Sequence, residues 1–347
     1  MKILLVEYKN IVNKSKSAFG HGKKALGEAA SICSQLGFDY ACAGSREYLE
    51  SLNCSVVDLP CAIHADKYGS KSIFNIFKNI STALKHNSDI VWFTNIDLYL
   101  LLYLATHKIE NKVIVTEYAD PLELMSLLKE RKRLVGKCIC ALLEKGIKKI
   151  NLTVQTYDAY LKSDNTIYMP DYIYYPRYEL MATKPKTNRV LCLGTMSHQK
   201  DIKGLVRVFQ NVDRELLIIG SFINKSSFDE VEKMASNNII IENRLLDYDE
   251  YYDLLASSEY VILPYKMEKY GSATSGVLRE AVYLGAKVIA PKALLNNMGI
   301  NGIGYTNIED VPALLNDDAV YYNDFEKYKE KNIVKRFNDE FIRMGLN

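Results

Sequence analysis

The segment of residues 269–291 combines the residue types that bind phosphate groups at the start of a helix. Its sequence, KYGSATSGVLREAVYLGAKVIAP, places two glycines and three hydroxyl side chains before an apolar helical pattern. If Ser275 or Thr274 caps this helix, the first backbone N–H groups have no partner within it. These groups belong to Gly276, Val277 and Leu278. With the positive end of the helix dipole, they form a site for a phosphate or a diphosphate.

A carboxylate follows this loop one helical turn later. Glu280 lies four residues after Gly276 on the same helical face, where a core-facing helix favours an apolar residue. A carboxylate in this position can accept hydrogen bonds from the hydroxyl groups of a ribose. The loop and Glu280 together therefore predict binding of a nucleoside diphosphate. The alternative is a capped helix with a glycine-rich start and a glutamate paired to a neighbour.

Short apolar runs alternate with helical patterns along the chain. The runs are KILLV (2–6), FDYACA (38–43), DIVWF (89–93), KVIVT (112–116), NLTVQ (151–155), RVLCLG (189–194), ELLIIG (215–220), NIIIE (238–242), YVILPY (260–265) and AKVIAP (286–291). This alternation is typical of parallel sheets covered by helices. We predict two tandem Rossmann-like, doubly wound α/β domains, with a ligand-binding cleft between the carboxyl ends of their sheets.

The domain boundaries follow from the chain length and from the prolines. A chain of 347 residues suits two domains. Three of the eight prolines lie close together, in the segment that joins the two series of strands. We predict an N-terminal domain at 1–170, a linker at 171–188 and a C-terminal domain at 189–323. A last helix within 324–347 is expected to fold back onto the N-terminal domain.

The composition indicates a globular, cytoplasmic protein. Hydrophobic residues make up 48% of the chain and charged residues 25%. The start, MKILLVEYKN, has too short an apolar run for a signal peptide or a membrane span. The seven cysteines are odd in number and lack C-x-x-C spacing, and the five histidines are scattered. This pattern favours reduced thiols and predicts no metal cluster.

Two segments of the N-terminal half combine basic and apolar residues. Residues 127–149 hold eight basic and two acidic residues, and residues 68–87 interleave lysines with Phe74 and Phe77. Basic amphipathic helices can lie on an anionic membrane surface, so we expect peripheral association with the inner face of the cytoplasmic membrane. The alternative is a solvated helix face whose apolar side packs on its own core. No nucleic-acid-binding motif accompanies the charge, so nucleic acid is not expected as a partner.

The C-terminal half resembles a known family over residues 189–292. YVILPY…TSGVLREAVYLGAKVIAP resembles the donor-binding segment of GT-B glycosyltransferases, especially family 4 of retaining enzymes, in which a "PY…SG.L.EA…G.PVIA" pattern recurs. LCLGTMSHQKDIKGLVRVF is similar to the strand, loop and Lys-Gly helix start that contact the donor diphosphate. NRLLDYDEYYDLLASSEYVILPY is similar to the segment beside the base. The resemblance implies the GT-B fold and a nucleotide-sugar donor.

This resemblance also implies a set of donor-binding residues. Lys203, before Gly204, is the first candidate for neutralising phosphate charge and Lys200 the second, the alternative being an exposed lysine. Family 4 enzymes carry two glutamates separated by seven residues, but counting back from Glu280 reaches Ser272. The glutamate that meets the sugar is therefore missing, which leaves the donor sugar and the retaining mechanism open. The other implied donor-binding residues are Arg244, Tyr265, Thr274, Ser275, Gly276, Val277, Leu278 and Glu280.

In the N-terminal half, two segments resemble parts of the same enzymes that face the transferred sugar. AFGHGKKALGEAA is similar to the glycine loop and first helix that close over this sugar, where Gly20 and Gly22 would let the loop bend. VIVTEYADPLE corresponds to a strand end that carries a histidine or an acid in relatives. Glu117 and Asp120 are therefore candidate catalytic residues, as a base or an orienting carboxylate. The alternative for Asp120 is a cap of the helix that starts at Pro121.

Two further patterns resemble metal sites only in spacing. Asp247 and Asp249 have the Asp-x-Asp spacing of metal-dependent transferases, but they lie at a predicted helix start, where aspartates act as caps. Cys138 and Cys140 flank one residue of a predicted helix, so their side chains diverge. We therefore expect neither a metal ion nor a cofactor, with the helix start and Lys203 neutralising the leaving diphosphate.

The sequence thus predicts a metal-independent glycosyltransferase. It would move a sugar from a nucleotide-diphosphate sugar to a glycan or lipid-linked acceptor in cell-surface polysaccharide synthesis. A sugar-nucleotide epimerase of the same fold is one alternative, which would turn over its substrate without an acceptor. The missing first glutamate suggests another, a non-catalytic nucleotide-sugar-binding partner subunit.

Overall fold

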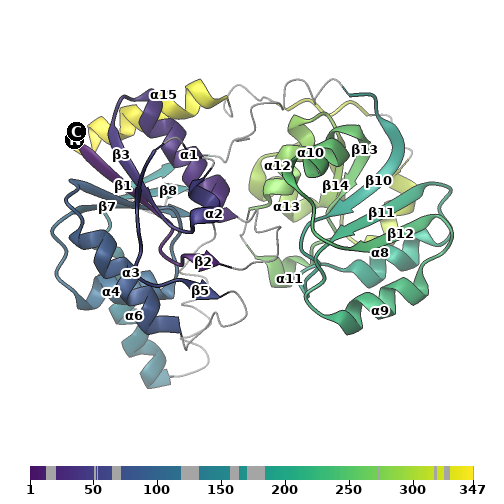
Figure 1. The fold of residues 1–347 in the computed structure, drawn as a ribbon. Helices are drawn as coiled ribbons and strands as arrows, with labels where there is room; N and C mark the ends of the chain where they lie inside the picture. Colours follow the sequence, from purple (N-terminus) through teal and green to yellow (C-terminus); the bar gives the residue numbers. More distant parts are fainter. Residues whose placement is uncertain are drawn as a thin grey trace. The chain divides into compact units, whose positions relative to one another are not determined.

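The computed structural model divides the chain into two compact units, which are drawn in Figure 1. The first unit is Met1–Tyr174 with Lys327–Asn347, and the second is Tyr175–Glu326. The structure describes residues 1–12, 21–50, 52, 54–64, 72–118, 133–156, 164–169, 184–271, 274–315, 319–323 and 329–346. Most of the predicted linker at 171–188 therefore lies outside the described residues.

The first unit is built on a parallel sheet of seven strands in the order β4-β3-β1-β6-β7-β8-β9. In chain order these strands are β1 (Lys2–Val6), β3 (Asp39–Ala43), β4 (Ser55–Val57), β6 (Ile90–Phe93), β7 (Lys112–Glu117), β8 (Leu152–Gln155) and β9 (Thr166–Tyr168). A separate short parallel pair joins β2 (Ile11–Val12) and β5 (Ile63–His64). Since both faces of the large sheet are covered, its central strands are apolar at nearly every position.

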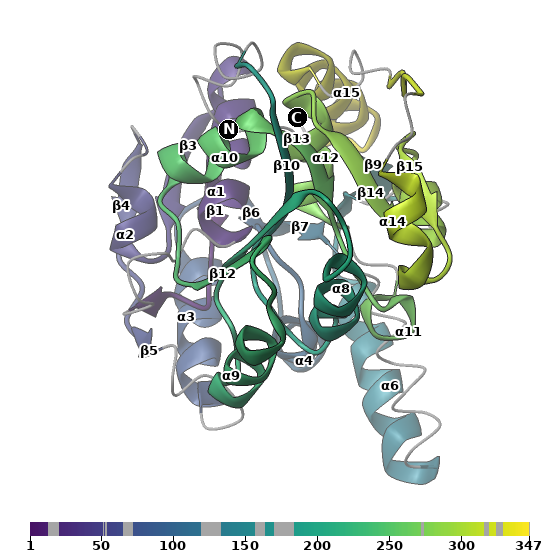
Figure 2. The same ribbon diagram turned by 90° about the vertical axis from the view of Figure 1, so that its right-hand side faces the viewer.

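Helices cover both faces of the first sheet (Figures 1 and 2). On one face lie α1 (His21–Gln35) and the C-terminal helix α15 (Glu330–Arg343), which pack on Ile3 and Leu5 of β1. On the other face lie α3 (Ile73–Lys85), α4 (Leu98–Thr106) and α6 (Arg133–Ile147), which pack on Leu4 and Val6. This alternation is the two-residue period of a strand. The ring of Phe337 in α15 stacks on that of Trp92, with centroids 4.9 Å apart.

The second unit repeats this arrangement with six parallel strands in the order β12-β11-β10-β13-β14-β15. In chain order they are β10 (Thr187–Leu193), β11 (Glu215–Gly220), β12 (Ile239–Asn243), β13 (Ser258–Ile262), β14 (Lys287–Pro291) and β15 (Ile303–Tyr305). Figure 1 shows α8 (Ile202–Phe209) and α9 (Lys225–Met234) on one face of the sheet. The other face carries α10 (Tyr248–Ser257), α12 (Gly276–Tyr283) and α13 (Lys292–Met298).

The two doubly wound parallel-sheet domains that the sequence predicts are confirmed, while the cleft between them stays a prediction. The shorter elements were not predicted: the strands β2, β4, β5, β9 and β15, the helices α2 (Arg46–Leu49), α11 (Met267–Tyr270), α13 and α14 (Val311–Leu314), and the 3-10 turn Ile308–Asp310. Within the described residues, no helix combines the length and the apolar character that crossing a bilayer requires.

Candidate functional site

The predicted phosphate-binding loop leads into the capped start of α12. Ser275 is the N-cap residue, and its side-chain oxygen accepts a hydrogen bond from the backbone N–H of Leu278 at 3.3 Å. Of the three N–H groups that the sequence assigns to a ligand, that of Leu278 is therefore used by the cap. The N–H groups of Gly276 and Val277 begin the helix at the positive end of its dipole.

Two glycines bring the loop after β10 close to this helix start. A Cβ atom on Gly220 would lie 1.9 Å from the carbonyl oxygen of Gly194, so a larger residue cannot replace Gly220 without moving the backbone. A Cβ on Gly194 itself would lie 3.5 Å from Nζ of Lys200 and 3.9 Å from Cγ2 of Val277. Gly194 thus has the Lys200 ammonium group and the first turn of α12 as neighbours on one side.

Lys200 is a buried lysine, with 6% of its surface exposed. Its Nζ donates a hydrogen bond to the carbonyl oxygen of Leu193 at 2.9 Å and lies 5.4 Å from the ring centroid of Tyr265. An ammonium group has three donors, and within the described part of the chain the Leu193 carbonyl is its one acceptor. A lysine buried in this way at the carboxyl end of a strand is suited to an anionic ligand.

Backbone pairing fixes the position of Lys200 relative to the loop after β13. Lys200 and Tyr265 form an isolated antiparallel bridge, and the N–H of Asp201 donates to the carbonyl oxygen of Pro264 at 2.6 Å. The Lys266 side chain also pairs with Asp201 at 3.3 Å. These contacts join the loops after two neighbouring strands, β10 and β13, at the carboxyl edge of the sheet.

Tyr270 continues this set of contacts to the start of α12. Its ring stacks on that of Tyr265 with centroids 3.8 Å apart, and its hydroxyl donates to the carbonyl oxygen of Thr274 at 2.6 Å. The hydroxyl group of Thr274 is itself buried and has no hydrogen-bond partner among the described residues. Leaving a buried hydroxyl without a partner costs about 1 to 3 kcal/mol. We therefore expect a ligand or a water molecule to bind this group.

Glu280 is buried and held by two tyrosines of α10. Its Oε2 accepts a hydrogen bond from the hydroxyl of Tyr251 at 2.6 Å, and its Oε1 accepts one from Tyr252 at 3.2 Å. Burial, followed by the negative charge of Glu280, raises the pKa of Tyr251 well above its usual value, so this phenol stays protonated. A carboxylate accepts hydrogen bonds at both of its oxygens, and here each oxygen accepts one from a phenol. No sequence spacing indicated these tyrosines.

Lys203 lies away from the start of α12. Its Nζ forms an ion pair with Glu230 of α9 at 2.5 Å, and both side chains are about half exposed. The following residue, Gly204, donates its N–H to the Asp201 carboxylate at 3.3 Å, which caps α8. A Cβ on Gly204 would collide with this carboxylate. The Lys-Gly pair is therefore explained locally by the helix cap and by a surface ion pair.

Arg244 is paired with two acidic residues at the surface. Its guanidinium binds the carboxylate of Glu250 through two nitrogens and that of Glu242 at 2.6 Å. The hydrogen bonds that Arg244 donates to Glu250 and then to Glu242 raise the pKa of Arg244, so it remains charged. The structure does not bring Arg244 into contact with Lys200 or Glu280.

The spacings that resemble metal sites have structural explanations. Asp247 caps α10 by accepting the N–H of Glu250 at 2.8 Å, which confirms the predicted cap. Cys138 is exposed and Cys140 is buried, so their side chains diverge as predicted. Among the residues that the structure describes, no group of three His, Cys, Asp or Glu side chains could hold a metal ion. Metal independence and the lack of a cofactor stay predictions.

Two buried carboxylates lie at the carboxyl edge of the first sheet. Glu117 ends β7 with 3% of its surface exposed, and its carbonyl oxygen accepts the N–H of Thr156 at 3.1 Å. Glu7 follows β1 with 6% exposed, and its carboxylate accepts the N–H of Asn10 at 3.0 Å. The sequence analysis missed Glu7, although an acid directly after a buried strand could have indicated it.

The remaining N-terminal candidates are described only in part. Gly22 is the second residue of α1 and is half-buried. Gly20 and Asp120 lie outside the described residues, as does Ser272 in the loop before α12. The predicted roles of Gly20, Gly22 and Asp120 stay predictions.

Comparison with solved structures identifies the fold. An α,α-trehalose-phosphate synthase (UDP-forming) from Burkholderia xenovorans, in complex with glucose-6-phosphate, superimposes with a TM-score of 0.65 at 10% identity, covering 99% of each chain. Anabaena Alr3699/HepE, in complex with UDP and glucose, superimposes with a TM-score of 0.59 at 14% identity, covering 99% of this chain and 95% of that chain. A UDP-GlcNAc 2-epimerase from Neisseria meningitidis, bound to UDP-GlcNAc, superimposes with a TM-score of 0.56 at 12% identity, covering 99% of this chain and 100% of that chain.

These likenesses extend over nearly the whole chain. The predicted GT-B fold, with tandem Rossmann-like domains, is therefore confirmed. No family model and no curated protein sequence matches the chain. At 10–14% identity the likeness concerns the fold. An assignment of function consequently depends on the residues at the carboxyl edges of the sheets.

Proposed function

We propose that this protein is a glycosyltransferase that moves a sugar from a nucleotide-diphosphate sugar to an acceptor. The observation that carries the proposal is the buried Lys200 ammonium group near the capped start of α12. Ligands of doubly wound sheets bind at the carboxyl ends of the strands, and a lysine combined with a helix N-terminus favours a diphosphate. Structures with the same fold contain UDP or UDP-GlcNAc, which makes UDP the first nucleotide to test.

In this proposal the diphosphate binds between Lys200 and the N–H groups of Gly276 and Val277. We assign the charge-neutralising role to Lys200 instead of Lys203, because the Lys203 side chain is paired with Glu230. The hydroxyl of Thr274, which has no partner among the described residues, is a further donor for a phosphate oxygen.

Glu280 would bind the ribose of the same nucleotide. It lies one turn after the start of α12, and Tyr251 and Tyr252 hold its carboxylate in one orientation. A pre-oriented carboxylate loses less freedom when it binds two hydroxyl groups than an exposed one does. Tyr251 and Tyr252 would therefore act as positioning residues for ribose recognition.

The transfer step needs a leaving group that is stabilised and an acceptor that can lose a proton. A bond forms between the acceptor hydroxyl oxygen and the anomeric carbon, and the bond between this carbon and the diphosphate oxygen breaks. The negative charge that develops on the released diphosphate is stabilised by Lys200 and the helix start. We propose that no divalent ion is needed for this. Glu117 and, as a second candidate, Glu7 are proposed to accept the acceptor proton or to orient the sugar. As acceptor we propose a glycan or lipid-linked precursor of a cell-surface polysaccharide.

A second enzyme class has support from one comparison. The fold is shared with a UDP-GlcNAc 2-epimerase. An epimerase would convert its nucleotide sugar without an acceptor and without releasing free nucleoside diphosphate. A non-catalytic binding subunit would bind the donor and neither convert nor transfer it. Product analysis therefore separates the three hypotheses.

The test begins with melting curves of the purified protein in a panel of nucleoside diphosphates and nucleotide sugars. A ligand at one hundred times its Kd adds about 2.7 kcal/mol to the free energy of unfolding. We expect at least one nucleoside diphosphate to raise the melting temperature, and release of that diphosphate from its sugar to depend on an added acceptor. If no nucleotide changes the melting temperature, the proposal is wrong.

A further inference from the structure

The helix layer on one face of the first sheet leaves apolar side chains in solvent. Figures 1 and 2 show α3, α4 and α6 in one layer, with α4 between the other two. The core-facing sides of α3 and α6 are occupied: Ile76, Ile80 and Ala83 of α3 and Cys140 and Leu143 of α6 are buried. Packing on the protein's own core, the alternative interpretation, therefore explains one side of each helix and leaves the outer side unexplained.

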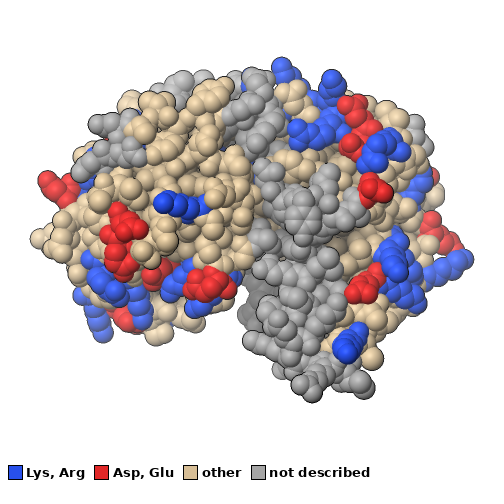
Figure 3. All heavy atoms as spheres, turned by 180° about the vertical axis from the view of Figure 1, so that it is seen from behind, with Lys and Arg blue, Asp and Glu red and all other residues tan. Residues whose placement is uncertain are grey.

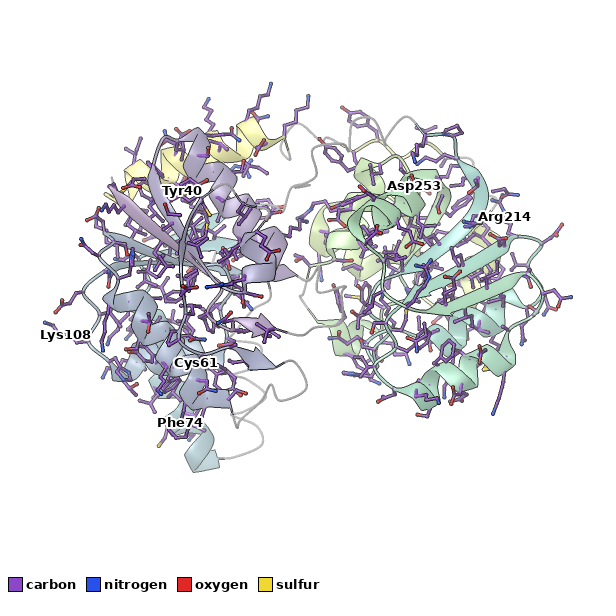
Figure 4. The ribbon with its side chains drawn as sticks, in the orientation of Figure 1. Tyr40, Cys61, Phe74, Lys108, Arg214 and Asp253 are labelled. Atoms are coloured by element: carbon purple, nitrogen blue, oxygen red, sulfur yellow. The ribbon has the colours of Figure 1, made fainter. Side chains whose placement is uncertain are left out.

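The outer side of α3 combines an exposed aromatic ring with lysines. Phe74 is 78% exposed, and Figure 4 shows it on the side of α3 away from the sheet. Lys78 follows one turn later, and Lys85 lies near the same face at the end of the helix. Both lysines are exposed and, within the described part of the chain, neither has a hydrogen-bond or ion-pair partner. No acidic residue occurs in α3.

The outer side of α6 has the same character. Ile139 and Leu142 are neighbours three residues apart, with 36% and 38% of their surfaces exposed, and Lys145 follows one turn after Leu142. Glu144 is the one acidic residue of α6, against three basic residues. Figure 3, a view from behind, shows Lys and Arg side chains interspersed with Asp and Glu side chains on the first unit, in the right-hand part. A large exposed phenylalanine with unpaired cations on both helices is unusual for a merely solvated face.

A groove lies between α3 and the end of α4 with the segment that joins α4 to β7. It has a volume of about 1360 Å³, and its lining includes Phe74, Lys78 and Lys85 together with Lys108 after α4. Lys108 is paired with Glu110 at 2.9 Å, and Figure 4 shows it at the edge of the same unit. The lining also contains Lys112, which donates to the carbonyl oxygen of Gly345, the amino terminus at Met1, and the acidic residues Asp89 and Glu110. Lys78 and Lys85 are thus lysines of the groove for which the described residues provide no partner, and they lie on the same helix as the exposed ring.

We propose that the outer side of this layer, formed by Phe74, Lys78, Lys85, Ile139, Leu142 and Lys145, docks onto an anionic membrane surface. The lysines complement the negative charge of the headgroups, and the apolar side chains enter the boundary between headgroups and acyl chains. The committed partner is a bilayer with anionic lipid. This proposal does not depend on the proposed enzymatic function, because vesicle binding is measured without nucleotide.

The experiment is flotation of the full chain with vesicles of phosphatidylcholine alone and of phosphatidylcholine mixed with phosphatidylglycerol. We expect binding to the mixed vesicles only, and weaker binding at higher salt. The double variant Lys78→Ala with Lys85→Ala should lose about fivefold in affinity per lysine. Phe74→Ser should lose about tenfold. All three side chains are exposed, so melting temperatures should stay near that of the wild type.

Matched controls lie in the second unit. Lys225→Ala with Lys233→Ala removes two exposed lysines of α9, and Ile223→Ser removes a side chain that is 61% exposed. These variants should bind like the wild type. The proposal is overturned if the wild type does not float with anionic vesicles at low salt. That result would favour an acidic protein as the partner of this surface. It is also overturned if the control variants lose as much affinity as the α3 variants.

Discussion

Replacing Lys200 by methionine is expected to weaken the binding of a nucleoside diphosphate by about tenfold to a hundredfold. Methionine keeps the length of the side chain but removes the ammonium group beside Gly194. A hydrogen bond between a charged donor and a phosphate oxygen contributes about 1.5 to 3 kcal/mol, and each 1.4 kcal/mol is one factor of ten. The expected loss follows directly from one such bond.

The stability of the unliganded protein should change much less. The substitution removes the hydrogen bond to the Leu193 carbonyl, which contributes about 1 kcal/mol. It also removes a buried charge, whose desolvation opposes folding, so the two effects offset each other. We therefore expect the free energy of unfolding to stay within about 1 kcal/mol of the wild-type value.

The assay is calorimetric titration of UDP into the wild type, Lys200→Met and the matched control Lys203→Met. The control removes a half-exposed ion pair with Glu230, and such pairs contribute about 0 to 1 kcal/mol. It should bind UDP like the wild type. The assignment of Lys200 is refuted if Lys200→Met binds UDP normally, or if Lys203→Met loses the same affinity.

Three further outcomes are expected. Glu280→Gln should lower UDP affinity about tenfold with little change in apo melting, and normal binding with a much lower melting temperature would make Glu280 structural. Tyr251→Phe should lower the ratio of UDP to 2′-deoxy-UDP affinity in competition titrations, whereas equal losses would mean that it does not position Glu280. Burial raises the pKa of Cys192 from 9.0 to about 11, so the protonated thiol stabilises the fold below pH 9 and this stabilisation is lost as the pH rises to about 11. In urea titrations between pH 9 and 11, the free energy of unfolding of Cys192→Ala should fall less steeply with pH than that of the wild type. Equal slopes would refute the contribution of Cys192.

Metal removal gives an additional test of the leaving-group chemistry. EDTA should leave nucleotide binding and sugar transfer unchanged, because Lys200 and the start of α12 supply the positive charge. The measurement is the initial rate of transfer before and after chelation. Loss of activity that stoichiometric manganese restores would contradict this expectation. Asp247 and Asp249 would then be the first candidates for metal ligands.

The long strands could be predicted from the sequence because they are buried on both faces of their sheets. A strand of a parallel sheet that is covered on both faces is apolar throughout, as ELLIIG (215–220) and KVIVT (112–116) are, and both runs coincide with β11 and β7. The pair β2 and β5 could not be predicted, because two residues in each strand show no periodicity. Their pairing depends on tertiary contacts, such as the Asn79 side chain bound to the carbonyl groups of Tyr8 and Cys61.

The arrangement of the candidate site could be predicted where its residues belong to one local sequence pattern. Ser275 and Glu280 belong to a single helix, so sequence spacing places both. The choice between Lys200 and Lys203 depends on backbone pairing between the loops after β10 and β13, which sequence spacing does not contain. Tyr251 reaches Glu280 from another helix, and two adjacent tyrosines give no signal that they share one carboxylate.

The most direct measurement is a crystal structure of the protein with bound UDP. We expect the diphosphate at the start of α12, with phosphate oxygens within hydrogen-bonding distance of Lys200 Nζ and of the N–H groups of Gly276 and Val277, and the ribose hydroxyl groups on Glu280. A nucleotide bound away from α12, with Lys200 still donating only to the Leu193 carbonyl, would contradict the proposed donor site.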